Sequence, residues 1–278
     1  MYIGTCAFSQ TAIESITIPS HVNSIFDNVF SECVQLRTVN FSANSELKFI
    51  VETITIPKHV QKIELFAFSY FQNSTSVDFE PNSELCYFDV NMFSGCSIQY
   101  LTIPSNVDRF KPNLFSGFSD SCNICISPDN HNLALINNRI LLGKTDKNSD
   151  NFDILFFARR DIEEANIPDF VKIIGPLSFT KCKQLRTVHF TENSQLTIID
   201  IDAFSDSSLQ SIIIPKSVTQ IKANAFSNCK FQNIVFPEDS QLREVDSKSF
   251  RHASFRNATI PHRLTNLIHI INICTLFL

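Results

Sequence analysis

The sequence predicts a mainly β solenoid, in which short coils stack so that their strands form a parallel sheet on a concave face. Two recurring features support this fold class: an apolar segment that ends in Ile-Pro, and a phenylalanine that follows a small residue. Phenylalanine accounts for 27 of the 278 residues, whereas glycine accounts for only 5 and tryptophan is absent. One residue type used this often indicates a single buried position that every coil fills again.

The apolar segments have two alternating forms, and neighbouring forms lie about 23 residues apart. One form ends in proline, which stops a strand because it lacks the N–H that a sheet needs. The other form ends in phenylalanine and precedes an Asn-Ser or Asp-Ser turn. Both alternate apolar and polar residues as a short strand does. The proline-ended segments are 16–19, 54–57, 101–104, 165–168, 212–215 and 258–261, and the phenylalanine-ended segments are 39–41, 77–79, 188–190 and 234–236.

The recurring phenylalanine predicts an aromatic column through the core, since stacked coils place equivalent residues next to one another. A cysteine often follows it three residues later, and this shared repeat position predicts a small buried hydrophobe. The phenylalanines are Phe8, Phe30, Phe68, Phe93, Phe115, Phe179, Phe204, Phe226 and Phe250, and the cysteines are Cys33, Cys96, Cys182 and Cys229.

The consensus I-x-x-x-A-F-x-x-C-x-x-L-x-x-I-x-I-P resembles the leucine-rich repeats of BspA-like surface proteins, over residues 1–120 and 161–262. The resemblance implies a curved, right-handed leucine-rich-repeat solenoid. It also implies a location at the cell surface and a role in binding matrix proteins or host cells, or in co-aggregation.

Two departures from the repeat divide the chain into three parts. Residues 1–120 form the N-terminal repeats, with a truncated coil and a local kink near 47–54, where about nine residues of a full coil are missing. Residues 121–160 form an irregular repeat that resembles the hairpin-like insert of this family, with strands at 140–142 and 154–157. Residues 161–278 form the C-terminal repeats and an apolar end, which is shorter than the ~20 residues that a spanning helix needs.

Composition and motifs argue against several functions. A net charge of −5 without clustered Lys and Arg does not suggest nucleic acid as a partner. No G-x-G-x-x-G, G-x-x-x-x-G-K-[ST], H-E-x-x-H or G-x-S-x-G motif occurs. We therefore predict no catalytic, metal-binding or cofactor-binding residues and no small-molecule substrate. The Cys122-x-x-Cys125 pair reads as structural, because Cys125 aligns with the strand position of Thr102.

An enzyme within the insert is the alternative, and it would require Asp129, His131 and Cys125 to meet in one buried pocket.

The outward face of the strands is the predicted binding surface, because repeat proteins bind partners on such extended faces. Its side chains are mostly short and polar, and Ile213 and Val235 are the adjacent apolar exceptions beside His189. We expect any hot spot to lie on this stretch. The predicted protein-binding residues are Tyr100, Thr102, Asn166, Thr187, His189, Ile213, Val235 and Asn233.

Two functions agree with these features. The first is a surface adhesin or antigen that contacts host or matrix proteins, which the family resemblance favours. The second is an intracellular scaffold for protein–protein interaction. The absence of a signal peptide in Met1-Tyr2-Ile3-Gly4 and the many cysteines favour the scaffold. Whether the chain contacts a membrane stays open.

Overall fold

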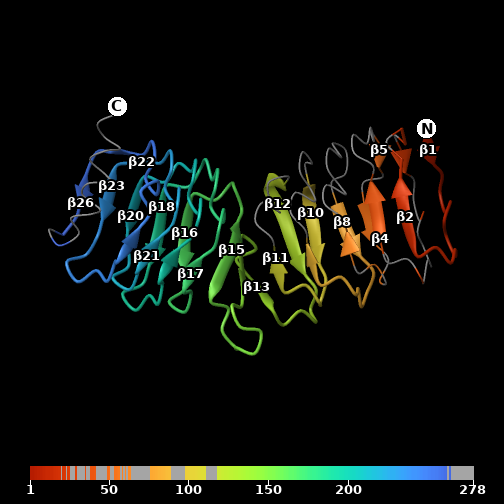
Figure 1. Ribbon diagram of the computed structural model, residues 1–278, viewed down its shortest axis with the longest axis horizontal. Coiled ribbons are helices and arrows are strands. Elements are labelled where there is room, and N and C mark those ends of the chain that lie inside the picture. Colours follow the sequence, from red (N-terminus) through yellow and green to blue (C-terminus); the bar gives the residue numbers. More distant parts are fainter. Residues whose placement is uncertain are drawn as a thin grey trace. The chain divides into compact units, whose positions relative to one another are not determined.

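The computed structural model divides the chain into two compact units, residues 1–134 and residues 135–278 (Figure 1). The residues that it describes are 1–19, 21–22, 24–25, 29, 35, 38–41, 49–50, 53–56, 58, 60, 62–63, 76–88, 98–110, 118–261 and 263. In both units parallel pairs of short strands build the sheets, and residues 140–158 form an antiparallel hairpin, so the predicted parallel-sheet solenoid is confirmed. Within the described residues every regular element is a strand.

The N-terminal unit contains two sheets that follow the predicted apolar segments. One has the order β12-β10-β8-β6 and the other the order β2-β4-β7. The strands of the first are β6 (Thr53–Ile56), β8 (Ser76–Phe79), β10 (Ile98–Ile103) and β12 (Phe118–Ile126), and those of the second are β2 (Ser15–Ile18), β4 (Thr38–Phe41) and β7 (Lys62–Ile63). Two-residue strands form further parallel pairs: β1 (Tyr2–Ile3), β3 (Ser24–Ile25), β5 (Phe49–Ile50), β9 (Tyr87–Phe88) and β11 (Arg109–Phe110).

One step of the predicted strand order is wrong. The repeat pattern predicts that segment 39–41 lies beside the next apolar segment, 54–57, but β4 pairs with β7, so that Val39 lies opposite Ile63. The shortened stretch between the two predicted strands explains the difference, because too few residues separate Phe41 from β6 for a complete coil. The truncated coil itself stays a prediction, since residues 42–48 and 51–52 lie outside the described residues.

The C-terminal unit has a five-stranded parallel sheet of order β16-β18-β20-β23-β26. Its strands are β16 (Glu164–Ile167), β18 (Thr187–Phe190), β20 (Ser211–Ile213), β23 (Asn233–Val235) and β26 (Ala258–Thr259). A second sheet has the order β13-β14-β15-β17-β19-β21-β24. Its strands are β13 (Leu133–Ile136), β14 (Ile140–Gly143), β15 (Ile154–Ala158), β17 (Ile173–Ile174), β19 (Ile198–Ile199), β21 (Gln220–Ile221) and β24 (Glu244–Val245). A third pairing joins β22 (Lys230–Phe231) and β25 (Ser254–Phe255).

The predicted aromatic column fills the core of this unit. The rings of Phe179, Phe204, Phe226 and Phe250 are fully buried and stack in that order, with centroids 4.8, 5.3 and 5.2 Å apart and planes within 12° of parallel. Phe8 in the N-terminal unit is half-buried. The other predicted members, Phe30, Phe68, Phe93 and Phe115, lie outside the described residues.

The backbone around Phe179, Phe204 and Phe226 shows how left-handed turns form here without glycine. Two residues before and two residues after Phe204, Asp202 and Asp206 adopt left-handed conformations with φ of 54° and 58°. Asp and Asn tolerate this region better than most residues do, because their short polar side chains bond locally. The same two positions hold Leu177 and Lys181 around Phe179, and Asn224 and Asn228 around Phe226.

The cysteine position after the phenylalanine is buried where the structure describes it. Cys182 and Cys229 have no exposed surface, and the Cys229 thiol donates to the Phe204 carbonyl at 3.2 Å, one coil earlier. Burial raises the pKa of the Cys229 thiol to about 12. These two residues are therefore the small buried groups that the repeat predicts, whereas Cys33 and Cys96 lie outside the described residues.

We expect iodoacetamide to leave Cys229 unmodified in the folded chain at pH 8, while the exposed Cys125 reacts. With a pKa of about 12, about one Cys229 thiol in ten thousand is ionised at that pH, and the thiolate is the reactive form. The stability that this neutral thiol contributes is complete below the ordinary thiol pKa and is lost as pH rises towards 12. Peptide mass spectrometry with and without urea measures the labelling, and equal rates at both cysteines in the folded chain would contradict the burial.

The predicted hairpin insert is present. β14 and β15 pair antiparallel, with Leu141 opposite Phe157, and β15 continues into the parallel ladder through β17. The buried carboxylate of Asp153 secures the hairpin loop, because it accepts hydrogen bonds from the backbone N–H and the hydroxyl of Thr145, both at 2.8 Å. The Nζ of Lys172 lies 3.4 Å from the same carboxylate.

Asp153→Asn is expected to lower the free energy of unfolding by about 1–2 kcal/mol at pH 7, because the charge-assisted bonds weaken. Burial alone would raise the pKa of the Asp153 carboxyl, but the hydrogen bonds from Thr145 and the nearby Lys172 outweigh burial and lower it. The wild-type chain should therefore lose this contribution as pH falls below about 4, through the lowered pKa. Urea titrations between pH 7 and pH 2 measure it, and an identical acid response in Asp153→Asn would show that Asp153 plays no part.

Candidate functional site

The outward face of the five-stranded sheet, here called the strand face, is formed by alternate residues of each strand. Along β16, Ala165 and Ile167 are buried while Glu164 and Asn166 are exposed, because successive side chains of a strand point to opposite sides. The strand face therefore consists of two columns of outward side chains. The central column is Asn166, His189, Ile213, Val235 and Thr259, and the neighbouring column is Glu164, Thr187, Ser211, Asn233 and Asn257.

The pairing register confirms the alignment of the repeats over this sheet. Asn166 lies opposite His189, and Ile213 lies opposite Val235. In the N-terminal unit the observed register also follows the repeat, because Tyr100 lies opposite Ser76 on one side and Asn123 on the other. A slip by one residue would have turned the polar column inward, so the hydrophobic pattern sets the register.

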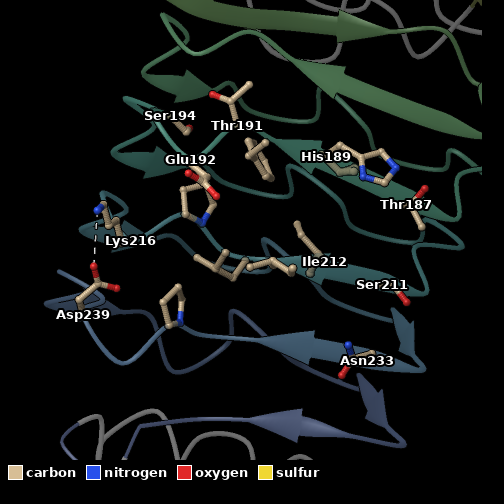
Figure 2. Close-up of a pocket in the computed structure, with 16 residues that line it drawn as sticks. Thr187, His189, Thr191, Glu192, Ser194, Ser211, Ile212, Lys216, Asn233 and Asp239 are labelled. Atoms are coloured by element: carbon tan, nitrogen blue, oxygen red, sulfur yellow. Dashed lines mark ion pairs between the residues drawn. The ribbon is translucent and has the colours of Figure 1, made fainter.

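A groove with a volume of about 560 Å³ crosses the strand face at β18, β20 and β23. Figure 2 shows Thr187, Ser211 and Asn233 at one end of the groove and Glu192, Lys216 and Asp239 at the other. The first three belong to the strands, whereas the last three belong to the turns that follow the strands. Pockets that bind small molecules commonly have volumes of several hundred Å³, so the groove is large enough to hold a few side chains of a partner.

The centre of the groove is apolar. Ile213 is 62% exposed, although Ile212 and Ile214 on either side of it are buried. The rings of Phe190, Pro215 and Pro237 also line the groove. An isoleucine this exposed has little contact with its own chain, so a partner that covers it gains most of the free energy of its burial.

The charged side chains of the groove lie at its turn end. The Nζ of Lys216 lies 3.5 Å from a carboxylate oxygen of Asp239, and both side chains are more than half exposed. An ion pair this exposed contributes little to stability. Glu192 has no ion pair or hydrogen bond from its side chain to any other residue that the structure describes.

The sequence matches the BspA type leucine-rich repeat region in six copies, over residues 1–50, 47–144 and 151–270. The chain belongs to the BspA-type leucine-rich repeat family. A search of curated protein sequences finds no significant match to this BspA-type chain.

Several solved structures resemble this BspA-type chain at low sequence identity, which shows the fold alone. The pneumococcal vaccine antigen PcpA is 20% identical with a TM-score of 0.55, over 92% of this chain and 73% of PcpA. A leucine-rich cell surface protein from Faecalibacterium prausnitzii A2-165 is 20% identical with a TM-score of 0.52, over 95% of this chain and 84% of that one. A leucine-rich repeat protein from Eubacterium ventriosum is 21% identical with a TM-score of 0.55, over 94% and 70%.

Four of the predicted binding residues of the BspA-type repeats line the groove: Thr187, His189, Ile213 and Asn233. Asn166 is exposed on β16 and Val235 is half-buried on β23, and neither lines the groove. The sequence prediction missed the turn residues of the groove. The only hint in the sequence was the proline or the Asn-Ser or Asp-Ser turn that follows each strand.

Two predicted residues, Tyr100 and Thr102, belong to the N-terminal unit. Tyr100 is 50% exposed on the outward side of β10. Thr102 is half-buried, and its hydroxyl donates to the Asp78 carboxylate at 2.6 Å, one coil earlier. Thr102 is thus occupied within the sheet, and Tyr100 is the outward residue there that offers a large surface.

The residues that an enzyme in the insert would require do not meet in a buried pocket. Cys125, Asp129 and His131 are all exposed. Within the described ranges, no three His, Cys, Asp or Glu side chains come together as metal ligands would. In that same part of the chain, no helix has the length and apolar character needed to cross a bilayer.

Proposed function

We propose that this chain is a non-enzymatic repeat protein that binds another protein through the strand face of its C-terminal unit. The observation that supports the proposal most directly is Ile213, which is 62% exposed in a groove lined by neighbouring outward residues. Hot spots of protein interfaces combine an apolar anchor near the centre with a polar surround that excludes water. Thr187, His189 and Asn233 supply such a surround.

The partner in this proposal is a host or matrix protein, and the chain acts as an adhesin or antigen at the cell surface. Membership in the BspA-type family supports this location. Of the structural relatives, PcpA is a vaccine antigen and the Faecalibacterium prausnitzii protein is a cell surface protein.

An intracellular scaffold that uses the same face is the second candidate. It is favoured by the free thiols of the described cysteines, of which Cys6, Cys86 and Cys125 are exposed. Exposed free thiols are uncommon in oxidising compartments. Surface biotinylation of intact cells separates the two candidates, because an unlabelled chain would rule out the adhesin.

Ile213→Asp is expected to weaken binding of the partner at least about tenfold, because a charge replaces the apolar anchor. Ile201→Asp is the matched control, since Ile201 is 48% exposed but lies outside the groove. Partners are captured by crosslinking to the purified chain, and their affinity for each variant is measured by calorimetry. Both variants should unfold at the temperature of the wild type. Unchanged binding by Ile213→Asp would refute the proposed site.

A further inference from the structure

The two ends of the strands in the C-terminal unit carry opposite charge. Exposed basic side chains gather within seven residues before β18, β23 and β26, and we call this set the amino rim. Its members are Lys181, Lys183, Arg186, Lys230, Arg251 and Arg256. The stretch before β20 carries an acid instead, Asp206, which is half-buried and accepts a hydrogen bond from Asn228 at 3.0 Å. Glu163 and Glu164 lie at β16, beside the first of these strands.

Exposed acidic side chains gather at the opposite ends of the strands. Within four residues after β16, β18 and β23 lie Asp169, Glu192, Glu238 and Asp239, which we call the carboxyl rim. The stretch after β20 carries a cation instead, Lys216, and its charge is offset by Asp239 at 3.5 Å. Glu192, in the groove, has no such counter-ion among the described residues.

The charge therefore changes sign in the same direction along β18 and β23, whereas β20 between them has Asp206 before it and Lys216 after it, each engaged by a neighbouring side chain. Arg186 and Glu192 precede and follow the same strand, β18, and Arg256 lies on the same rim as Arg186 several coils away. A partner gains from this field only if its own charge changes in the strand direction. A partner of uniform charge would be attracted at one rim and repelled at the other.

Between the two rims lies the apolar centre of the groove. Ile213 is exposed on β20, and in the sequence it lies between Ser211 and Lys216, which Figure 2 shows at the two ends of the groove. At ~3.3 Å per residue, the six positions from Arg186 to Glu192 span roughly 15–20 Å. An extended segment of five or six residues covers that distance.

We propose that the groove binds an extended segment of a protein partner that lies along the strands and is charged at both ends. A basic side chain of the segment lies beside Glu192, an apolar side chain covers Ile213, and an acidic side chain lies near Arg186. This inference rests on the proposed function, and it adds the chemistry and the direction of the partner. The charges supply selectivity and rate of association, and the apolar contact supplies most of the affinity.

The test uses a phage library of random twelve-residue peptides, selected on the full chain and depleted on Ile213→Asp. The selected peptides should carry an acidic and a basic residue on opposite sides of a large apolar residue, about five or six positions apart. Their synthetic forms should bind Glu192→Lys at least tenfold more weakly than the wild type. Replacing the basic residue of the peptide by Glu should reverse this preference. Ile201→Asp should bind as the wild type does.

The outcomes separate the inference from the proposed function. Peptides that require Ile213 but show no charge pattern, or that bind Glu192→Lys and Arg186→Glu unchanged, would overturn the inference and leave the strand face as a binding site. A library that yields no peptide dependent on Ile213 would overturn both. Binding of heparin through the amino rim, unaffected by Ile213→Asp and without any selected peptide, would also overturn the inference in favour of a polyanion.

Discussion

Phe204→Ala is expected to lower the free energy of unfolding of the chain by about 3–5 kcal/mol. The ring is fully buried between those of Phe179 and Phe226, with centroids 4.8 and 5.3 Å away. The loss exceeds the transfer free energy of the ring alone because the neighbouring coils cannot close the gap. They are held apart by the backbone, in which the Phe204 N–H donates to the Ala225 carbonyl at 2.8 Å.

Urea denaturation followed by circular dichroism measures this effect, and hydrogen exchange of the Phe204 and Ala225 amides locates it. Phe204→Leu should lose clearly less, since the leucine refills part of the gap. Phe152→Ala is the second control, because that ring is half-buried and packs against the core from outside the stack. A loss in Phe204→Ala no larger than in Phe152→Ala would contradict the stack as the main support of these coils.

The fold could be predicted from the sequence because every coil has to bury the same kind of apolar side chain at the same repeat position. A phenylalanine that returns at one repeat position has to lie in the shared interior, as Phe204 and Phe226 do. The strand register follows from alternation, which predicts that Ile212 points inward and Ile213 outward, as both do. Both inferences use only the period of the apolar residues, and the period is a property of the sequence.

The turn half of the groove could not be predicted in the same way. Glu192, Lys216 and Asp239 lie beside Ile213 only because of the path of the turns, and turn residues carry no apolar period. The wrong prediction for the neighbour of β4 has a related cause, since a shortened coil changes which strand comes next without changing any local pattern. Sequence reasoning therefore identified the residues of the sheet face and missed the residues that close it.

The turns after the phenylalanine-ended strands show what the Asn-Ser pattern contributes. The Ser194 hydroxyl accepts a hydrogen bond from the Leu196 N–H at 3.3 Å, and its carbonyl accepts one from the Ser217 hydroxyl at 2.8 Å, one coil later. The same turn recurs at Ser83 and Ser240, with Asn106 and Arg263 as the donors of the next coil. The sequence predicted the local turn, but the bond to the next coil depends on stacking.

Asn130 joins the last regular coil of the N-terminal unit to the chain that follows, and its replacement should be nearly as costly as that of Phe204. Its buried amide donates to the carbonyls of Pro104 at 2.7 Å and Val107 at 2.9 Å. Its carbonyl oxygen accepts from the N–H groups of Asn132 at 2.9 Å and Leu133 at 3.1 Å. All four bonding positions of the side chain are therefore used.

We expect Asn130→Ala to lower the free energy of unfolding by about 2–4 kcal/mol, because buried backbone groups lose their partners. Urea denaturation measures this loss at pH 7. The matched test is Asn130→Asp, which keeps the acceptor for Asn132 and Leu133 but turns a carboxylate towards two carbonyl oxygens. It should be destabilised at pH 7 at least as much as Asn130→Ala.

The pH dependence of Asn130→Asp makes the argument specific to the hydrogen bonds. Only a neutral carboxyl can donate to the carbonyls of Pro104 or Val107, so folding raises the pKa of the introduced Asp above the unfolded value of about 3.9. Its stabilising contribution is then complete below that value and is lost as pH rises through the folded pKa. The variant should therefore recover part of its stability, relative to the wild type, between pH 7 and pH 4. If the difference in unfolding free energy between Asn130→Asp and the wild type stayed constant over that range, the hydrogen bonds donated by the Asn130 amide would not contribute to stability.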